Sequence, residues 1–358
     1  MILKVFKIFM LLSFFSLFGL CAESGDTSNV VNRGNSCENS SEDDTISICM
    51  ATDDNYAQHA GVTIASILTN AAPSDKLKIY ILHKNLSEEN IAKLKQLKSI
   101  RNFELAFRNV GTDTVNHLKL NHKDLTLAAW FRLFIPELCP DCKNKILYMD
   151  VDMIVLKSLK ELWNTNLNGY CAAVVDDFTE IDGKYEYKKN VLKLPPPYRY
   201  FNSGLILFNL QQCAKDKIFD NAIKFGLENS YKLKFEDQDT LNVVMYGKLL
   251  YLPIKYNLQN GNPRKVFLSP KRYTVLKFAY QSCIEAFKDP VIIHYVSNKP
   301  WNFFSNHPYR ELYYKYLQLT PWKNNYSILA SIRYKIVMCA RSLYFGMIDF
   351  ILNRKLPV

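Results

Sequence analysis

Cysteine is scarce in this sequence of 358 residues and follows no ligand pattern: there are nine cysteines, and the one close pair is Cys139 and Cys142. A single pair cannot complete a tetrahedral zinc site, and an odd, scattered set does not make a disulfide framework. The sequence therefore excludes a zinc-ribbon protein and a small disulfide-stapled protein. A link between Cys139 and Cys142 is expected only in an oxidising compartment.

Acidic residues are outnumbered, since 34 aspartates and glutamates stand against 45 lysines and arginines, a formal net charge of +11. Such a surplus favours an anionic partner: a nucleic acid, a phosphorylated small molecule or an acidic membrane surface. The globular part has no basic helix and no aromatic RNA-binding motif, so we do not expect nucleic-acid binding. Hydrophobic residues make up 48% of the chain, which allows a sizeable core and excludes disorder for most of the chain.

The amino terminus has the pattern of a targeting segment. Lys4 and Lys7 precede an apolar run within residues 1–22, as in a signal peptide or a short signal-anchor. The run is marginally short for a full membrane span, which needs about 20 apolar residues. Leu20 is too large for a good cleavage site, however, so we favour a retained anchor over cleavage. The positive-inside bias places the rest of the chain on the far side of the membrane. Residues 23–44, rich in Ser, Asn, Asp, Glu and Gly, are expected to form a flexible stem.

Residues 45–320 are predicted to form one α/β domain, because short apolar segments alternate with helical patterns. Helices are expected from residue 57 onward, after the N-cap Ser87 and at 128–138. The expected strands are 46–51, 77–82, 103–107, 145–149, 171–175, 204–209 and 291–295. This alternation favours a mostly parallel central sheet.

Residues 321–358 differ in composition from the domain that precedes them. Apolar residues mix here with the basic residues Arg333, Lys335, Arg341, Arg354 and Lys355. The mixture predicts a basic amphipathic helical tail, which could lie on a membrane surface or pack on the domain. Gly346 could interrupt the helix.

Two carboxylates stand at the end of the strand expected at 145–149. Asp150 and Asp152 flank Val151, and residues two apart in a strand share one face. Ligands of open α/β sheets bind beyond the carboxyl ends of the strands. Two carboxylates held there would repel each other unless a cation lay between them. The segment therefore predicts a divalent-metal site beside a diphosphate, and the alternative is a solvated turn at a strand end.

Polar groups follow other expected strands as well. Residues 51–56, Ala-Thr-Asp-Asp-Asn-Tyr, lie where a nucleotide-binding fold meets the base and ribose, although these aspartates could also cap the next helix. The strand expected at 291–295 delivers His294, and the loop after it delivers Lys299, which could neutralise phosphate. An imidazole ligand suits Mn²⁺ better than Mg²⁺. Two more polar segments, Tyr-Phe-Asn-Ser-Gly-Leu and Phe-Glu-Asp-Gln-Asp-Thr, begin at Tyr200 and Phe235.

Together these five segments resemble the retaining glycosyltransferase family 8, which includes bacterial lipopolysaccharide galactosyl- and glucosyltransferases and the glycogenins. The resemblance covers about residues 46–301, with the motifs in the family's order and approximate spacing. It implies a GT-A-type, Rossmann-like single domain. One departure is the loop between His294 and Lys299, which is one residue shorter than the family's pattern and has Ser297 near the place of a glycine.

The resemblance also implies roles for individual residues. It assigns the metal to Asp150, Asp152 and His294, with Mn²⁺ as the expected ion and Mg²⁺ as the alternative. It places Asp237 and Gln238 at the reacting face of the anomeric carbon as the catalytic pair. The residues that it implies for donor binding are Ala51, Asp53, Asn55, Arg132, Asp150, Val151, Asp176, Asn202 and Lys299.

The implied reaction moves a hexose, glucose or galactose, from a UDP-sugar to a glycan acceptor of lipopolysaccharide or glycoprotein type and forms an α linkage. Retention requires two displacements or a same-face attack, and we favour the latter because an amide such as Gln238 is a poor nucleophile. We expect a membrane-associated protein, with the domain in the secretory-pathway lumen or at the bacterial inner-membrane face.

Two other functions are the alternatives to this one. A sugar-nucleotide pyrophosphorylase would be expected to carry a glycine-rich basic loop where this chain has Thr-Asp-Asp-Asn at 52–55. A catalytically inactive carbohydrate-binding relative would be free to lose its metal ligands, and all three candidates are present here.

Overall fold

A computed structural model describes most of the chain after the amino-terminal segment. The described residues are 44–111, 117–118, 127–177, 185–195, 199–259, 285–296 and 299–351. The chain divides into two units, Met1–Ser40 and Ser41–Val358, and every described residue belongs to the second. The anchor predicted at 1–22 and the stem up to residue 43 lie outside the described residues. Within the described stretches, no helix combines the length and apolar character that a membrane crossing requires.

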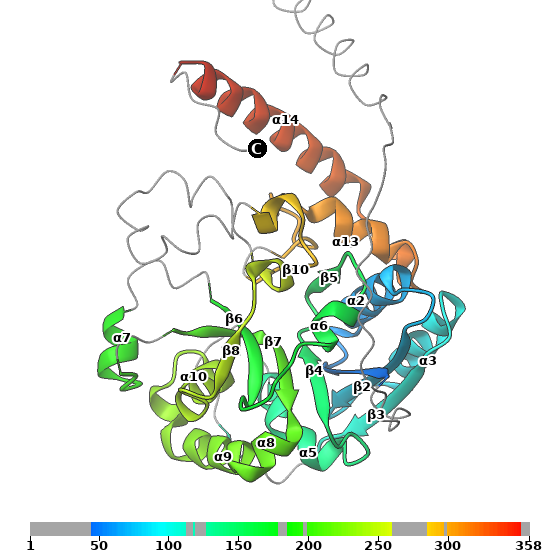
Figure 1. The fold of residues 1–358 in the computed structure, drawn as a ribbon. Coiled ribbons are helices and arrows are strands. Elements are labelled where there is room, and N and C mark those ends of the chain that lie inside the picture. The colour runs from blue at the N-terminus through cyan, green and yellow to red at the C-terminus, as the bar shows by residue number, and fades with distance from the viewer. Residues whose placement is uncertain are drawn as a thin grey trace, which may run out of the picture. The chain divides into compact units, whose positions relative to one another are not determined.

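A seven-stranded sheet organises the domain, with the strand order β3-β2-β1-β4-β7-β6-β8 (Figure 1). Neighbouring strands pair in parallel except for β7, which is antiparallel to both β4 and β6. The predicted mostly parallel sheet is therefore confirmed, although the strand expected at 204–209 runs against the others. The strands are β1 (Thr45–Ala51), β2 (Lys76–His83), β3 (Glu104–Asn109), β4 (Lys145–Met149), β6 (Ala172–Asp176), β7 (Phe201–Asn209) and β8 (Leu249–Tyr251).

Helices connect the strands. Ser87 is the N-cap of α3 (Glu88–Gln96), as predicted, since its side chain accepts from the Asn90 N–H. The described α-helices are α2 (Ala57–Asn70), α3 (Glu88–Gln96), α5 (Ile135–Leu138), α6 (Lys160–Trp163), α7 (Tyr185–Asn190), α8 (Leu210–Lys215), α9 (Ile218–Asn229), α10 (Glu236–Val244), α13 (Arg310–Leu317) and α14 (Ile328–Ile351). The described 3-10 helices are η1 (Leu97–Ser99), η2 (Leu127–Phe134), η4 (Ser230–Lys232), η5 (Ile254–Tyr256) and η7 (Lys323–Asn325).

Both faces of the sheet are buried, which follows from the alternation of side chains along each strand. In β1, Ile46, Ile48 and Met50 enter one core, and Cys49 and Ala51 enter the other. Helix α2 belongs to the first core, with α13 packed on it, and α8, α9 and α10 lie together over the second face (Figure 1). A sheet covered on both faces needs nearly continuous apolar strands, which is why these segments were readily found in the sequence.

A second sheet of three strands, in the order β5-β10-β9, stands next to the end of β4. Its strands are β5 (Met153–Val155), β10 (Ile292–His294) and β9 (Leu258–Gln259). Register places His294 opposite Met153 in an antiparallel pair and beside Gln259 in a parallel pair. This small sheet therefore brings a histidine from late in the chain next to Asp152.

Two local expectations turn out differently. The helix predicted at 128–138 is the 3-10 helix η2 followed by one α turn, with Pro136 at the start of that turn. Proline has no backbone N–H, so it cannot continue the hydrogen-bond ladder of a single helix. Cys139 and Cys142 are free thiols, and the link considered for them is not formed.

The carboxyl-terminal tail forms helix α14, which runs for 24 residues without a break at Gly346. One side of the helix packs on the domain. The Tyr334 hydroxyl donates to His307 O at 3.0 Å, and Arg310 donates to the Ser331 hydroxyl at 3.2 Å. The predicted helical character of the tail therefore holds for residues 328–351.

Candidate active site

Three potential metal ligands meet at the carboxyl ends of β4 and β10. One atom each of Asp150, Asp152 and His294 lies within 4.8 Å of the others. His294 Nε2 is 3.1 Å from Asp152 Oδ1 and 3.8 Å from Asp150 Oδ2. Backbone hydrogen bonds set this geometry, since the Asp150 N–H donates to Gly204 O at 2.8 Å and the Tyr295 N–H donates to Asp152 O at 2.9 Å. The fold thus brings together the three residues that the sequence predicted as metal ligands.

The charges around Asp152 favour its ionised form. Burial raises the pKa of this carboxyl, but the Lys299 ammonium outweighs burial and holds the pKa well below its usual value. Lys299 contacts Asp152 and also donates to Tyr295 O at 2.7 Å. Two carboxylates and an imidazole form a ligand set that suits Mn²⁺ better than Mg²⁺, which prefers oxygen alone. The residues present therefore fit a divalent ion.

Gly204 leaves the space that the cluster occupies. A Cβ atom at this position would lie 2.4 Å from His294 Cε1 and 2.7 Å from Asp150 Oδ2. Atoms of folded proteins do not approach so closely, so any side chain here would displace one of the two ligands. The glycine of the predicted Asn-Ser-Gly segment is therefore required by close packing of the site.

A buried arginine links the metal ligands to the predicted catalytic pair. Arg132, in η2, donates to Asp150 Oδ1 at 3.0 Å, and its Nε lies 3.1 Å from Asp237 Oδ2. It also donates to Ser203 O and stacks on the Tyr148 ring, 4.2 Å from the centroid. Because the Arg132 side chain is only 4% exposed, its charge requires the two carboxylates as partners.

Asp237 and Gln238 stand side by side at the start of α10, but they face different partners. Asp237 pairs with Arg132. Gln238 donates from Nε2 to Asp177 Oδ2 at 2.7 Å and accepts at Oε1 from the Ser203 N–H at 3.0 Å. Both side chains are buried, so their orientation is set by these contacts.

Asp237 should make the stability of the metal-free protein depend on pH. Burial raises its pKa from 3.8 to about 7, although Arg132 opposes the shift. The folded protein then holds a proton that the unfolded chain has lost, so the free energy of unfolding should fall as the pH rises from about 4 to about 7. Asp237→Asn removes this titration. Urea unfolding across this pH range should show a steeper loss for the wild type than for the variant, and equal slopes would contradict the shift.

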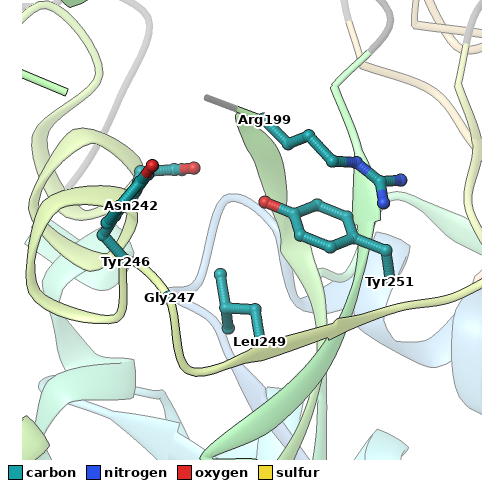
Figure 2. Close-up of a pocket in the computed structure, with 6 residues that line it drawn as sticks. All are labelled: Arg199, Asn242, Tyr246, Gly247, Leu249 and Tyr251. Carbon is teal, nitrogen blue, oxygen red and sulfur yellow. The ribbon is translucent and has the colours of Figure 1, made fainter. Parts of the chain in front are cut away.

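Asp176 ends β6 and is held by an arginine that sequence reasoning missed. Arg199 donates from Nε to Asp176 Oδ1 at 3.0 Å, makes a second contact from Nη2, and stacks on Tyr251, 3.5 Å from the ring centroid. Figure 2 shows the Tyr251 hydroxyl directed toward Asn242 and Tyr246 across a pocket of about 180 Å³. The other residues lining this pocket are Gly247 and Leu249. The two contacts from Arg199 hold the Asp176 carboxylate in its orientation.

The loop after β1 is tied to the helices around it. Asp53 Oδ1 accepts from the Tyr56 N–H at 3.0 Å in the turn before α2, whereas the N-cap of the helix, Tyr56, makes no side-chain cap hydrogen bond. Ala51 is buried and Asn55 is exposed. Trp301 stacks on His59 of α2 with centroids 3.6 Å apart, which joins the segment after β10 to the segment after β1.

The remaining predicted residues also lie at this edge of the sheet. Asn202, at the start of β7, donates to Gln238 Oε1 at 3.3 Å. Val151 is buried, and its carbonyl accepts from the Thr63 hydroxyl at 2.7 Å. Lys299 is placed at Asp152, whereas Ser297 lies outside the described residues.

Asp177 was missed, although paired carboxylates at a strand end are the signal that identified Asp150 and Asp152. Arg199 and Asn257, whose Oδ1 lies 3.0 Å from His294 Nδ1, gave no such signal, because neither stands next to a recognisable strand end in the sequence.

The chain is similar in sequence to proteins of one known family. The model of the family described as Glycosyl transferase family 8 matches residues 47–304. "General stress protein A" of Bacillus subtilis (strain 168) is 29% identical over 292 residues, which cover 78% of this chain and 96% of that protein. "Lipopolysaccharide 1,2-glucosyltransferase" of Escherichia coli (strain K12) is 28% identical over 284 residues, with 78% of this chain and 80% of that protein covered.

Solved structures share the fold. The galactosyltransferase LgtC, in complex with donor and acceptor sugar analogues, superposes with a TM-score of 0.68 at 24% identity, covering 78% of this chain and 100% of that chain. The apo structure of the bifunctional glycosyltransferase WbbM gives a TM-score of 0.65 at 27% identity, covering 90% of this chain and 58% of that chain. The predicted GT-A-type fold is thereby confirmed. Because the family model spans more than half of the sequence, this chain belongs to glycosyl transferase family 8.

Proposed function

We propose that this protein is a metal-dependent, retaining hexosyltransferase that moves glucose or galactose from a UDP-sugar to a glycan acceptor and forms an α linkage. The observation that carries the proposal is the arrangement of Asp150, Asp152 and His294 beside Asp237, with Arg132 in contact with a carboxylate of each group. Two similar proteins, a lipopolysaccharide 1,2-glucosyltransferase and a galactosyltransferase, support the same substrate class.

The metal would be held by Asp150, Asp152 and His294, with Mn²⁺ favoured because one ligand is an imidazole. When bound, a divalent ion supplies Lewis-acid stabilisation of the charge that develops on the diphosphate leaving group. Lys299, whose ammonium contacts Asp152, would add a second positive charge that stabilises the same diphosphate. The loop after β1 would bind the uridine through Ala51, Asp53 and Asn55, and Val151 would contribute from between the metal ligands.

The contacts of Gln238 favour same-face attack over a covalent intermediate. Its carbonyl oxygen already accepts from the Ser203 N–H and from Asn202, and an amide oxygen is a weak nucleophile. Asp237 is paired with Arg132 and so is turned toward the guanidinium. We propose that both residues shape the face on which the acceptor hydroxyl enters, with Asn202 and Asp176 holding the donor hexose.

Product stereochemistry tests the retaining assignment. Transfer from UDP-glucose or UDP-galactose to a glycan acceptor should give a product whose new anomeric proton shows the small coupling constant of an α linkage in its NMR spectrum. A β product would exclude retention. Transfer of no hexose by a folded protein that still binds sugar would favour an inactive carbohydrate-binding relative, and formation of a UDP-sugar from UTP and hexose 1-phosphate would favour a pyrophosphorylase.

We further propose that α14 attaches the domain to an anionic membrane surface. Leu329, Ile332, Ile336 and Leu343 are between 52% and 74% exposed and recur at helical spacing on one side, with Lys335 exposed beside them. The full-length protein should sediment with phosphatidylglycerol–phosphatidylcholine vesicles. The double variant Ile332→Asp, Ile336→Asp should bind about tenfold more weakly, since each change removes apolar burial and adds a negative charge. Leu227→Asp, at another exposed leucine, is the control. Equal binding by all three proteins would refute attachment through α14.

A further inference from the structure

A row of buried side chains joins the metal cluster to Gln238. His294 Nδ1 lies 3.0 Å from Asn257 Oδ1, and Asn257 Nδ2 donates to Asn202 Oδ1 at 2.9 Å. Asn202 Nδ2 donates in turn to Gln238 Oε1 at 3.3 Å, and the row ends where Gln238 donates to Asp177. Asn257, which lies between η5 and β9, is 0% exposed. We propose that Asn257 is a positioning residue that orients both His294 and Gln238 and thereby couples ion binding to the reacting face.

Two backbone N–H groups determine the direction of this amide row, by which we mean Asn257, Asn202 and Gln238. The Gly204 N–H donates to Asn202 Oδ1 at 3.1 Å, and the Ser203 N–H donates to Gln238 Oε1 at 3.0 Å. A backbone N–H can only donate, so each of these side-chain atoms must be a carbonyl oxygen. Asn257 consequently turns its NH₂ group toward Asn202 and its oxygen toward His294.

The oxygen of Asn257 selects the tautomer of His294. A neutral imidazole carries its proton on one nitrogen, and because Asn257 Oδ1 can only accept, that proton lies on Nδ1. The lone pair of Nε2 then points toward Asp152 and Asp150, at 3.1 Å and 3.8 Å. The opposite tautomer would present an N–H to the same space and could not ligate a cation. Partners behind a metal-binding histidine commonly act in this way.

The other end of the amide row orients Gln238. With its oxygen held by Asn202 and the Ser203 N–H, the amide NH₂ faces Asp177. Asn202 is 5% exposed and Gln238 is 8% exposed, so solvent is poorly placed to replace a lost partner. Reversing one amide would set two acceptors against each other in a buried site, which is costly. A substitution of Asn257 should therefore affect both His294 and Gln238.

Two substitutions separate the effect of Asn257 on ion binding from its effect on Gln238. Only the test of the effect on Gln238 rests on the proposed function. Asn257→Leu removes both hydrogen bonds and should weaken Mn²⁺ binding about 10- to 100-fold in an EPR titration of the full-length protein. Asn257→Asp keeps an acceptor for His294 but sets a carboxylate against Asn202 Oδ1. It should hold Mn²⁺ within about threefold of the wild type, yet lower kcat for UDP release at least about tenfold, with a smaller change in the donor KM.

Asn209→Leu is the control, because Asn209, like Asn257, uses both ends of its side-chain amide in hydrogen bonds but lies at the far end of β7; its partners are the Leu167 carbonyl and the Gln212 N–H. It should leave Mn²⁺ affinity unchanged. Wild-type Mn²⁺ affinity in Asn257→Leu, or absence of Mn²⁺ binding by the wild type, would overturn the proposal. Wild-type kcat in Asn257→Asp would overturn the coupling to Gln238. Mn²⁺ binding requires no turnover, so a protein that binds Mn²⁺ but transfers no hexose would refute the proposed function while still testing Asn257.

Discussion

Replacing Gly204 with alanine is expected to abolish Mn²⁺ binding and to lower hexose transfer at least about 100-fold, because a shift of about 1 Å in a catalytic group has an effect of that size. The added Cβ would lie 2.4 Å from His294 Cε1 and 2.7 Å from Asp150 Oδ2. Asp150 cannot rotate away without loss, since Arg132 and the Tyr148 hydroxyl both donate to its Oδ1. One methyl group should therefore separate two metal ligands that the fold holds together.

Gly111→Ala is the matched control for this prediction. A Cβ at Gly111 would meet nothing within 4 Å, so the variant should keep wild-type Mn²⁺ affinity and transfer. Thermal unfolding checks that Gly204→Ala still folds. A folded Gly204→Ala protein with wild-type Mn²⁺ affinity would show that His294 and Asp150 do not bind the ion jointly.

Asp152→Asn is expected to have an effect of comparable size, for an electrostatic reason. The substitution keeps the shape of the side chain but removes the charge that faces both His294 and Lys299. Mn²⁺ affinity and transfer should each fall at least about 100-fold, because a neutral amide is a much weaker ligand for a hard cation. Lys299 would also lose its buried partner. Its side chain remains 21% exposed, so we expect a loss of about 1–3 kcal/mol of stability, less than for a fully buried pair.

The strand-end residues could be predicted because one rule of the fold applies to them. Parallel strands place the loops at their carboxyl ends along one edge of the sheet, and buried strands are visible as apolar runs. Asp150, Asp152 and His294 were found in this way, and the structure places all three at that edge. The family resemblance assigned His294 to the metal and added Asp176, which ends β6.

The contacts that join these residues could not be predicted from local patterns. The reversed strand β7 places Gly204 against Asp150, and only a long-range pairing decides its direction. Arg199 reaches Asp176, and Asn257 reaches His294, across gaps in sequence that carry no periodic signal. The loop between His294 and Lys299 departs from the family's spacing, yet Lys299 still contacts Asp152. The metal ligands can therefore be found from local sequence patterns, whereas the residues that hold them in place depend on tertiary packing.

We propose that Asp150, Asp152 and His294 hold a divalent ion that is needed to break the bond between UDP and a hexose. The most direct test is UDP release by the full-length protein from UDP-glucose and from UDP-galactose, with and without Mn²⁺, for the wild type, Asp152→Asn and the control Asp289→Asn, whose side chain is 71% exposed. We expect Mn²⁺-dependent release from one of the two donors by the wild type and the control, and none by Asp152→Asn. Equal release by all three proteins, or release that is indifferent to Mn²⁺ and to its removal by a chelator, would show that cleavage of the donor needs no divalent ion at these residues.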